Sequence, residues 1–400
     1  MRRVAISCFG LLFLTLFSGS AVMAQSQGLA SAQSVLKQPE VVDSESFFEE
    51  MGAHVKFART NKMSQDAKAG LAQQRVVSVP NWSSSFTFQG QVFPYTMVGR
   101  NPRRGDSTEV DTSLIALSFF FDEFVDSSGN NIVFDVTPDV PNVVNSPDFL
   151  DAPYGTGFTQ FGDAIQRAEF FNVMERDWHT RVERPRMLTP VQIEVPVGAA
   201  HLFRSRRTGT LFALMDINFF ISQLNTIIQL ENIKVTELSL MVSPNTLLFE
   251  NGDVTQCCVL GFHTAFETKA VGNTHFVQTL AWASWLDPGI FRDPEVADVL
   301  PFSHEVSEWL NDPFINNATP AWQFPDGSGA CQANLETGDP VEVLPHESIP
   351  VTLHGFVYHP QTEALLQWFS RETPSSAIDG AYSYPDEAAL PTASQACAHP

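Results

Sequence analysis

The residues of this chain that are best placed to do chemistry lie in one short run, H-E-V-S-E at residues 304–308. In an α-helix, residues four apart lie on one face, so His304 and Glu308 can reach the same metal ion. Glu305 lies roughly 100° further round such a helix, where it can contact a metal-bound water without ligating the ion. The run therefore predicts a helix that carries two metal ligands and one base.

Zinc is the metal that this arrangement favours. The spacing is that of the H-E-x-x-H helix of zinc metallopeptidases, with Glu308 in place of the second His. Zinc accepts carboxylate oxygens, but the replacement makes the site more anionic and less selective, so other divalent metals also fit. A surface helix with scattered charges is the alternative interpretation.

The third ligand must come from elsewhere in the chain, because a catalytic zinc needs three protein ligands and an open position for water. Glu336 and Asp339 are the leading candidates, since they follow the helix by a modest loop and flank a glycine that allows a tight turn. His263 is the alternative, because it ends an apolar, strand-like run. We interpret Asp312 as a helix-end residue.

A peptide-hydrolysing mechanism follows from these roles. A bound metal would lower the pKa of a water and polarise a peptide carbonyl. Glu305 would take the water proton and pass it to the leaving amine. Tyr358 or His354 is the candidate for stabilising the oxyanion, because both lie in the strand predicted after the third-ligand loop. A buried tyrosine and a surface histidine are the alternatives.

The elements that position these residues follow from periodicity and turn signals. Asp293-Pro294 is typical of a helix start and Asp312-Pro313 of a helix end, so we expect the metal-binding helix between them. Asp216 is placed to cap another helix. That helix is expected at 217–228 and one more at 158–174, with strands at 83–95, 114–121, 187–215, 238–242, 245–249 and 275–285.

This order of elements indicates an α+β fold. A soft boundary near 185–215 separates a β-rich N-terminal region, 76–200, from a metal-binding domain, 201–400. One continuous domain from 76 to 400 is the alternative. Residues 25–75 are rich in Gln, Ser and Ala, and we expect a propeptide or an N-terminal arm there.

Residues 1–24 have the features of an export signal. A basic pair, Arg2 and Arg3, precedes the apolar residues 4–17, and Val22 and Ala24 are the small residues of a cleavage site. We therefore expect a secreted or periplasmic protein. No second apolar stretch of about 18 residues follows, so no membrane contact is expected after cleavage.

The composition excludes some classes of function. The formal net charge is −22, and it becomes −24 when Arg2 and Arg3 are removed. Such an acidic chain repels phosphate backbones, so nucleic-acid binding is not expected. With 44% hydrophobic and 17% charged residues, the chain is typical of a globular protein with a large core.

The cysteines predict disulfides. Cys8 leaves with the signal, and the four that remain are Cys257, Cys258, Cys331 and Cys397. An even number in an exported chain suggests two disulfides. We expect the adjacent pair to bond outward, to Cys331 and Cys397. A zinc site of four thiolates is the competing interpretation, but C-x-x-C pairs are missing.

Residues 258–372 also resemble a set of secreted bacterial metallopeptidases. That set carries S-H-E-x-x-E-x-x-x-D-P, then an E-x-x-D element, a V-T-L…G…Y segment and a closing L-Q-x-W-S. The corresponding segments here are 303–313, E-T-G-D at 336–339, V-T-L-H-G-F-V-Y at 351–358 and L-Q-W-F-S at 366–370. The resemblance implies a zincin-like C-terminal domain with His304 and Glu308 as ligands and Glu305 as base. Trp309 stands where the set has Ala, which narrows the space beside the helix.

The sequence supports two functions best. The first is a secreted zinc peptidase that acts on a peptide or protein substrate. The alternative is a non-catalytic secreted protein that binds a peptide or glycan on a zincin-like scaffold. A purely structural, β-rich secreted protein is a third, weaker hypothesis. The sequence does not predict an oligomeric state.

Overall fold

The computed structural model describes residues 2–4, 36–50, 75–342, 344–345 and 347–397. Most of the predicted signal peptide and much of the segment 25–75 lie outside these residues. The described residues 36–50 pack against the rest of the protein, because β2 (Glu40–Val42) pairs with β14 and the side chains of Val42 and Phe48 are buried. None of the helices in the described part of the chain has the length and apolar character needed to cross a membrane.

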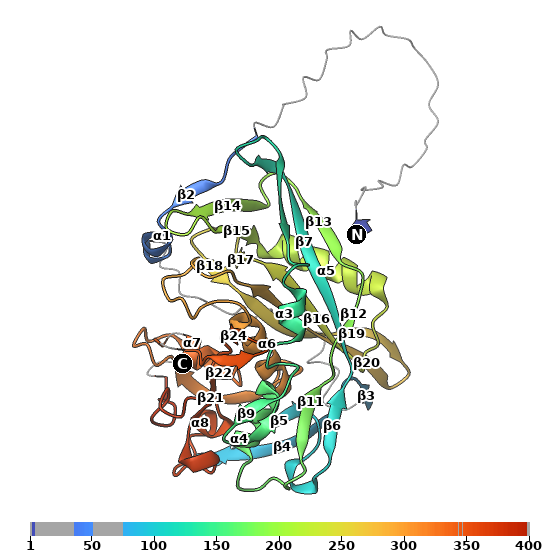
Figure 1. Ribbon diagram of the computed structural model, residues 1–400. Helices are drawn as coiled ribbons and strands as arrows, with labels where there is room; N and C mark the ends of the chain where they lie inside the picture. Colours follow the sequence, from blue (N-terminus) through green and yellow to red (C-terminus); the bar gives the residue numbers. More distant parts are fainter. Residues whose placement is uncertain (1, 5–35, 51–74, 343, 346, 398–400) are drawn as a thin grey trace, which may run out of the picture.

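A nine-stranded mixed sheet forms the centre of the molecule (Figure 1). Its main path runs β1-β13-β7-β16-β20-β19; the neighbours from β13 to β20 are parallel, and β19 is antiparallel to β20. Strands β8 and β12 pair with β7, and β3 pairs with β20. The strands are β1 (Arg2–Val4), β3 (Arg75–Val77), β7 (Thr112–Val125), β8 (Asn131–Asp135), β12 (Arg186–Met187), β13 (Val191–Val195), β16 (Leu238–Pro244), β19 (Gly261–Val271) and β20 (Thr274–Trp285).

A second, five-stranded sheet has the order β18-β17-β15-β14-β2. Its other strands are β14 (Ala200–Ser205), β15 (Leu211–Asp216), β17 (Thr246–Phe249) and β18 (Cys257–Val259). Helix α5 (Ile217–Glu231) follows β15 directly, and the Asp216 side chain accepts hydrogen bonds from the backbone N–H groups of Asn218 and Phe219, both at 2.9 Å. The cap predicted at Asp216 is therefore confirmed.

The remaining elements are short. Two-stranded ladders join β4 (Asn81–Phe88) to β5 (Gln91–Val98), β6 (Ser107–Val110) to β11 (His179–Val182), β9 (Ala152–Tyr154) to β10 (Gly157–Thr159), β21 (Ala318–Gln323) to β22 (Cys331–Asn334), β23 (Val351–Leu353) to β24 (Phe356–Tyr358), and β25 (Glu363–Ala364) to β26 (Ser383–Tyr384). The other helices are α1 (Ser44–Glu50), α3 (Val140–Val144), α4 (Phe161–Glu169), α6 (Leu300–Asn311), α7 (Asp339–Glu342) and α8 (Leu366–Ser370).

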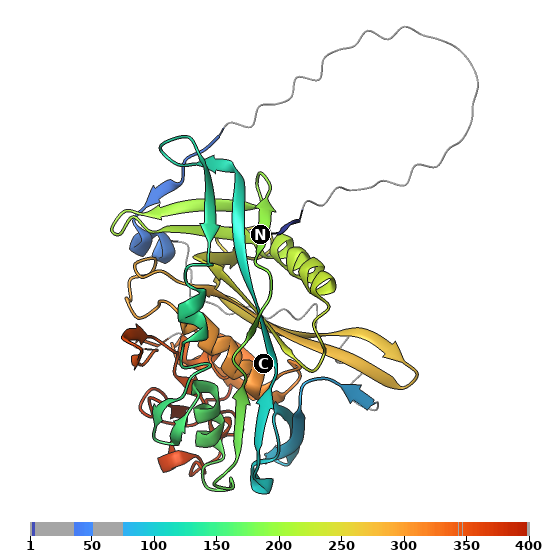
Figure 2. The same cartoon turned by 45° about the vertical axis from the view of Figure 1, so that its right-hand side comes forward.

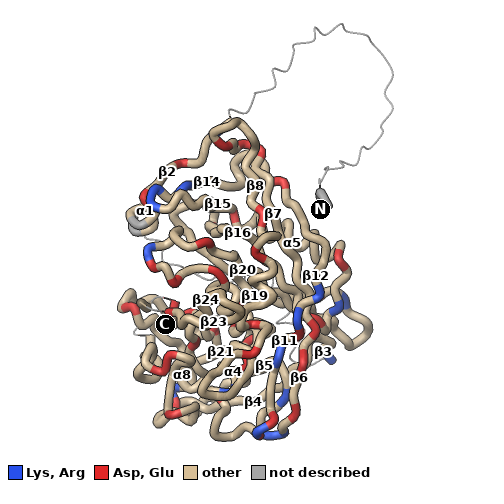
Figure 3. The backbone as a smooth tube through the Cα atoms, in the orientation of Figure 1, with Lys and Arg blue, Asp and Glu red and all other residues tan. Residues whose placement is uncertain are grey.

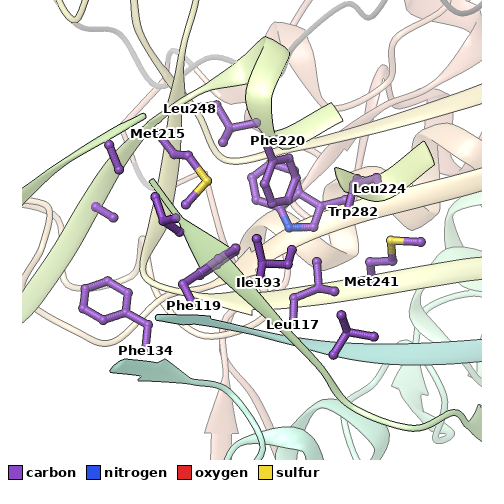
Figure 4. Packing of buried hydrophobic residues seen from close by; sticks show 14 of the residues in the cluster. Leu117, Phe119, Phe134, Ile193, Met215, Phe220, Leu224, Met241, Leu248 and Trp282 are labelled. Atoms are coloured by element: carbon purple, nitrogen blue, oxygen red, sulfur yellow. The ribbon is translucent and has the colours of Figure 1, made fainter. Parts of the chain in front are cut away.

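The large sheet has a separate core on each face, because side chains alternate along a strand. Phe119, Phe220 and Trp282 belong to the cluster on the α5 side, which Figure 4 shows from close by. Residues next to these on the strands, such as Ala281 and Ala283, belong to the cluster that contains α6. Figure 2 shows α5 on the opposite side of the sheet from the C-terminal elements.

The helix with the H-E-V-S-E run ends where expected but begins later than expected. Helix α6 ends at Asn311, before Asp312-Pro313, but it begins at Leu300 rather than after Asp293. The Asp293 carboxylate caps only a short turn, by accepting a hydrogen bond from the backbone N–H of Glu295. The prediction of a start at Asp293-Pro294 is therefore wrong; Pro301 occupies the first turn of the helix instead.

The fold is of the mixed class that the sequence predicts, with strands more abundant than helices. Strand β7 pairs with β16, so the large sheet joins segments from both sides of the boundary suggested near residue 200. The expected helix at 158–174 is shorter, since α4 ends at Glu169.

The cysteine pairing differs from the expectation. Cys331 pairs with Cys397, and Cys257 pairs with its neighbour Cys258, so the predicted outward bonds of the adjacent pair are wrong. The reason lies in the path of the C-terminal segment, which runs beside β21: the N–H of Gln323 donates to the carbonyl of Gln395, and Trp322 bridges to Ala396. This path carries Cys397 to β22 and away from β18.

Candidate metal centre

Helix α6 is buried along its whole length, and it has two different faces. Val306, Trp309 and Leu310 join the apolar cluster against the sheet, next to the small side chains of Ala281 and Ala283. The polar side chains lie on the other sides of the helix: Glu305 contacts His263 of β19, whereas His304 and Glu308 lie toward the segment 331–339. Because the apolar and the polar sides of α6 are both buried, its polar groups are shielded from water.

The C-terminal end of α6 is held by side chains from other elements. The amide of Gln166 donates to the carbonyl of Leu310 at 2.9 Å, and the amide of Asn317 donates to that of Asn311 at 2.7 Å. These bonds satisfy carbonyls that a helix end leaves without partners. The Asp312 carboxylate accepts from the N–H groups of Asn316 and Asn317, so its interpretation as a helix-end residue is confirmed.

The imidazole of His304 is oriented by an amide. Its Nδ1 lies 3.1 Å from Oε1 of Gln361, and the Nε2 of Gln361 donates to the carbonyl of Gly338 at 2.8 Å. Because Oε1 can only accept, the proton of a neutral His304 is on Nδ1. Its Nε2 then presents a lone pair, which lies 3.2 Å from Oε1 of Glu308 and 3.8 Å from Oδ1 of Asp339.

The imidazole of His263 enters the same cluster from strand β19. His263 pairs with Ala281, whose side chain faces α6, so His263 faces α6 as well. Its Nε2 lies 3.2 Å from the backbone carbonyl of Asp312, and its Nδ1 lies 3.1 Å from Oε2 of Glu305 and 3.5 Å from Oε2 of Glu308.

The two other carboxylates are held by β22. The side-chain amide of Asn334 donates to Glu336, and that of Gln332 donates to Asp339. Glu336 lies on the His263 side, with Oε2 at 3.8 Å from Nε2 of that histidine, whereas Asp339 lies on the His304 side. The structure therefore brings both sequence-predicted loop carboxylates to the helix, each beside a different histidine.

Two sets of three donors are close enough to hold a metal ion. One donor atom from each of His304, Glu308 and Asp339 lies within 4.8 Å of the others, and the same is true of His263, Glu305 and Glu308. All five side chains are at most 4% exposed. The first set is the one that the sequence predicts, with Asp339 as its third member.

Burial keeps both histidines neutral. It lowers the pKa of His263 to about 3 and that of His304 to about 4. Burial also raises the pKa of Glu305 and of Glu308 well above 4.5, and neighbouring carboxylates, including that of Asp339, raise both further. Neutral imidazoles are the form that binds metal, and the carboxyl protons are what a cation would displace.

A comparison with Glu237 shows that Glu305 and Glu308 have no lysine or arginine partner among the described residues. Glu237 is equally buried, but hydrogen bonds from Lys234, Ser113 and Arg186 outweigh its burial and hold its pKa at about 2. Figure 3 shows basic residues interspersed with acidic ones around β6, β11 and β12. Among the described residues, only histidines form ion pairs with Glu305 and Glu308. The donor set thus fits a divalent cation.

Two candidates for the oxyanion role lie away from this cluster. The hydroxyl of Tyr358 donates to the backbone carbonyl of Asn142 at 3.0 Å, and its ring packs among apolar residues. Burial raises the pKa of Tyr358 to about 12, so the group stays protonated. His354 is exposed at the turn between β23 and β24. The structure does not bring either residue to Glu305.

Several residues of the centre have roles that the sequence does not predict, although Gly338 lies in the predicted third-ligand loop. Gln361 orients His304, and Gly338 lies so close that a β-carbon there would collide with the His304 ring. Gly261 has the same relation to Glu305, whose Cγ would lie 2.7 Å from an added β-carbon. Glu363 is fully buried near Glu308. His263, the alternative third ligand, does lie in this centre, with its neighbour Phe262 on the other face of β19.

Comparisons with protein-family models, with curated proteins and with solved structures find no match for this chain.

Replacing Gly338 is expected to weaken metal binding through the position of His304. In Gly338→Ala, the new methyl group must push the imidazole away from Glu308 and Asp339. We expect an affinity about 10- to 100-fold lower, as for the loss of other groups that orient a ligand. A competition titration against a chelator measures it. The control is Gly155→Ala, whose β-carbon would lie 3.2 Å from the Tyr384 hydroxyl, and equal affinities in the two variants would contradict the geometry.

Metal affinity is expected to rise with pH. In the metal-free protein, Glu305 and Glu308 keep their protons above pH 4.5 because their pKa values are raised, and a metal must displace these protons. His263 and His304 are already neutral at about pH 5, so they do not oppose this trend. Up to the raised carboxyl pKa, affinity should increase by about tenfold per pH unit for each proton released. Isothermal titration in buffers of different ionisation enthalpy counts the protons; an affinity that falls with pH would refute the assignment.

Proposed function

We propose that this protein binds a divalent metal ion, with zinc as the first expectation, through His304, Glu308 and Asp339. The observation that carries the proposal is the orientation of His304. Gln361 takes the proton-bearing side of the ring, and the lone pair on Nε2 faces two buried carboxylates at 3.2 and 3.8 Å. A lone pair that faces carboxylate oxygens needs either a carboxyl proton or a metal ion between them, and this geometry suits a metal ion.

The chemistry of the donors supports zinc without excluding other ions. One imidazole nitrogen and two carboxylate oxygens form a set that zinc accepts, as do manganese and ferrous iron. Gly338 N–H donates to Oε1 of Glu308 at 3.0 Å, and Gln332 donates to Asp339, so both carboxylates are oriented by second partners. Groups that fix metal ligands in this way are typical of metal sites.

Hydrolysis of a peptide or protein substrate is the second candidate function. The observation in its favour is Glu305, which is adjacent to His304 and whose Oε1 has no hydrogen-bond partner among the described residues. Once a bound metal has displaced its own proton, this carboxylate can accept another. A bound zinc would supply an activated water and polarise a carbonyl. Glu305 would hold the proton, but a peptide must first reach side chains that are 0–3% exposed. Burial therefore ranks metal binding ahead of peptidase activity.

The setting of this function is an exported protein. The basic and apolar pattern of residues 1–24 supports secretion or transfer to the periplasm. The disulfide between Cys331 and Cys397 supports the same setting, because such bonds persist in oxidising compartments. The resemblance of residues 258–372 to secreted metallopeptidases supports a zincin-like scaffold for either a peptidase or a non-catalytic binding protein.

Metal analysis tests the first proposal. The purified protein should carry metal, and a chelator should remove it and lower the melting temperature. His304→Gln and Asp339→Asn should each weaken binding by at least roughly 100-fold, since a ligand matters more than the groups that orient it. His275→Gln is the matched control, because His275 pairs with Glu267 on the β19–β20 hairpin. Metal-free protein that binds no divalent ion would refute the proposal.

Casein cleavage tests the second candidate. A peptidase should cleave casein when loaded with zinc, and Glu305→Gln should abolish cleavage while the ion at His304, Glu308 and Asp339 is retained. Tyr358→Phe should leave the rate unchanged, since the Tyr358 hydroxyl donates its hydrogen bond to the backbone carbonyl of Asn142 and not to the centre. Loaded protein that cleaves neither casein nor a peptide library would leave metal binding without hydrolysis as the function.

A further inference from the structure

We propose that the centre holds two metal ions that share Glu308 as a bridging ligand. His304, Glu308 and Asp339 bind the first ion, and His263, Glu305 and Glu308 bind the second. The proposal rests on the metal-binding function proposed above and adds a second site to it. It also changes the role of Glu305, which becomes a ligand.

The bridging role follows from the two oxygens of Glu308. Oε1 lies 3.2 Å from Nε2 of His304, and Oε2 lies 3.5 Å from Nδ1 of His263. Each oxygen thus faces a different imidazole. A carboxylate that presents one oxygen to each of two ions suits sites whose metals lie about 3.5–4 Å apart.

The second site has its own oriented histidine. Nε2 of His263 lies 3.2 Å from the carbonyl oxygen of Asp312, which can only accept a hydrogen bond. The proton of the neutral ring is therefore on Nε2, and Nδ1 presents its lone pair to Glu305 and Glu308. The same logic applies to His304, where the side-chain amide of Gln361 replaces the backbone carbonyl and the lone pair is on Nε2.

Glu305 completes the second set. Its Oε2 lies 3.1 Å from Nδ1 of His263, and its Oε1 has no hydrogen-bond partner among the described residues although the side chain is 1% exposed. An ionised carboxylate that is buried without a donor is costly, so the group either keeps a proton or binds a cation. Gly261 makes the position possible, because a β-carbon there would lie 2.7 Å from Cγ of Glu305.

The charges also fit two ions better than one. The two donor sets contain three carboxylates, those of Glu305, Glu308 and Asp339, and a fourth, Glu336, lies 3.8 Å from Nε2 of His263. One divalent ion balances two of these charges, and two ions balance all four. With mainly oxygen donors and one imidazole for each ion, manganese, ferrous iron and zinc are the expected occupants.

Metal stoichiometry tests the proposal. The metal-free full chain is titrated with Zn²⁺, and bound metal is counted after gel filtration; about two ions per chain are expected. His263→Gln and Glu305→Gln should each retain about one ion, held by His304, Glu308 and Asp339. Glu308→Gln should lose both ions, and the control His275→Gln should keep both.

Spectroscopy of the unmodified protein gives a second test that does not depend on whether the variants fold. Two Mn²⁺ ions joined by one carboxylate should give an exchange-coupled electron paramagnetic resonance spectrum. A chain that binds one ion, with the same content in His263→Gln, would overturn the bridged pair and leave the proposed function standing. Two ions with uncoupled spectra would also overturn it. A chain that binds no ion would refute both proposals.

Discussion

The carboxylate of Glu308, enclosed between two imidazoles, is the constraint on which the rest of the centre depends. A buried carboxylate is costly unless hydrogen bonds and a cation compensate for the lost water. The Gly338 N–H supplies one hydrogen bond, and both histidines are neutral, so neither brings a positive charge. The compensating charge, a proton or a metal ion, must therefore come from outside the described part of the chain.

The sheet decides where this carboxylate lies. Helix α6 approaches the sheet over alanines, and β19 places His263 on that same face through its register with Ala281. The alternation that sends Phe262 into one core thus sends His263 toward the helix on the other side. A shift of one residue in this pairing would remove the histidine from the centre altogether.

Local patterns predicted the parts of the centre that depend on helix geometry. The i, i+4 relation of His304 and Glu308 is of this kind. The cap at Asp216 is another local pattern that the structure confirms, in α5, and Asp339 was one of two candidates from the loop that follows the helix. The helix start near Asp293 was wrong because a capping aspartate does not show how far the turn it caps continues. Gln361 and Gly338 act through contacts across the fold, and the cysteine pairing depends on the path of the C-terminal segment. Such long-range relations have no local signal, and the same limit applies to the hydrogen bond from Tyr358 to the carbonyl of Asn142.

The Cys331–Cys397 disulfide has a bearing on the centre although its sulfurs are not part of it. Cys331 begins β22, and the next residues of that strand, Gln332 and Asn334, donate to Asp339 and Glu336. The disulfide thus restrains the strand whose side-chain amides orient the carboxylates of Asp339 and Glu336. If the centre binds an ion as proposed, reduction of this disulfide would free the start of β22 and weaken ion binding, whereas an oxidising compartment would favour the ion-binding form.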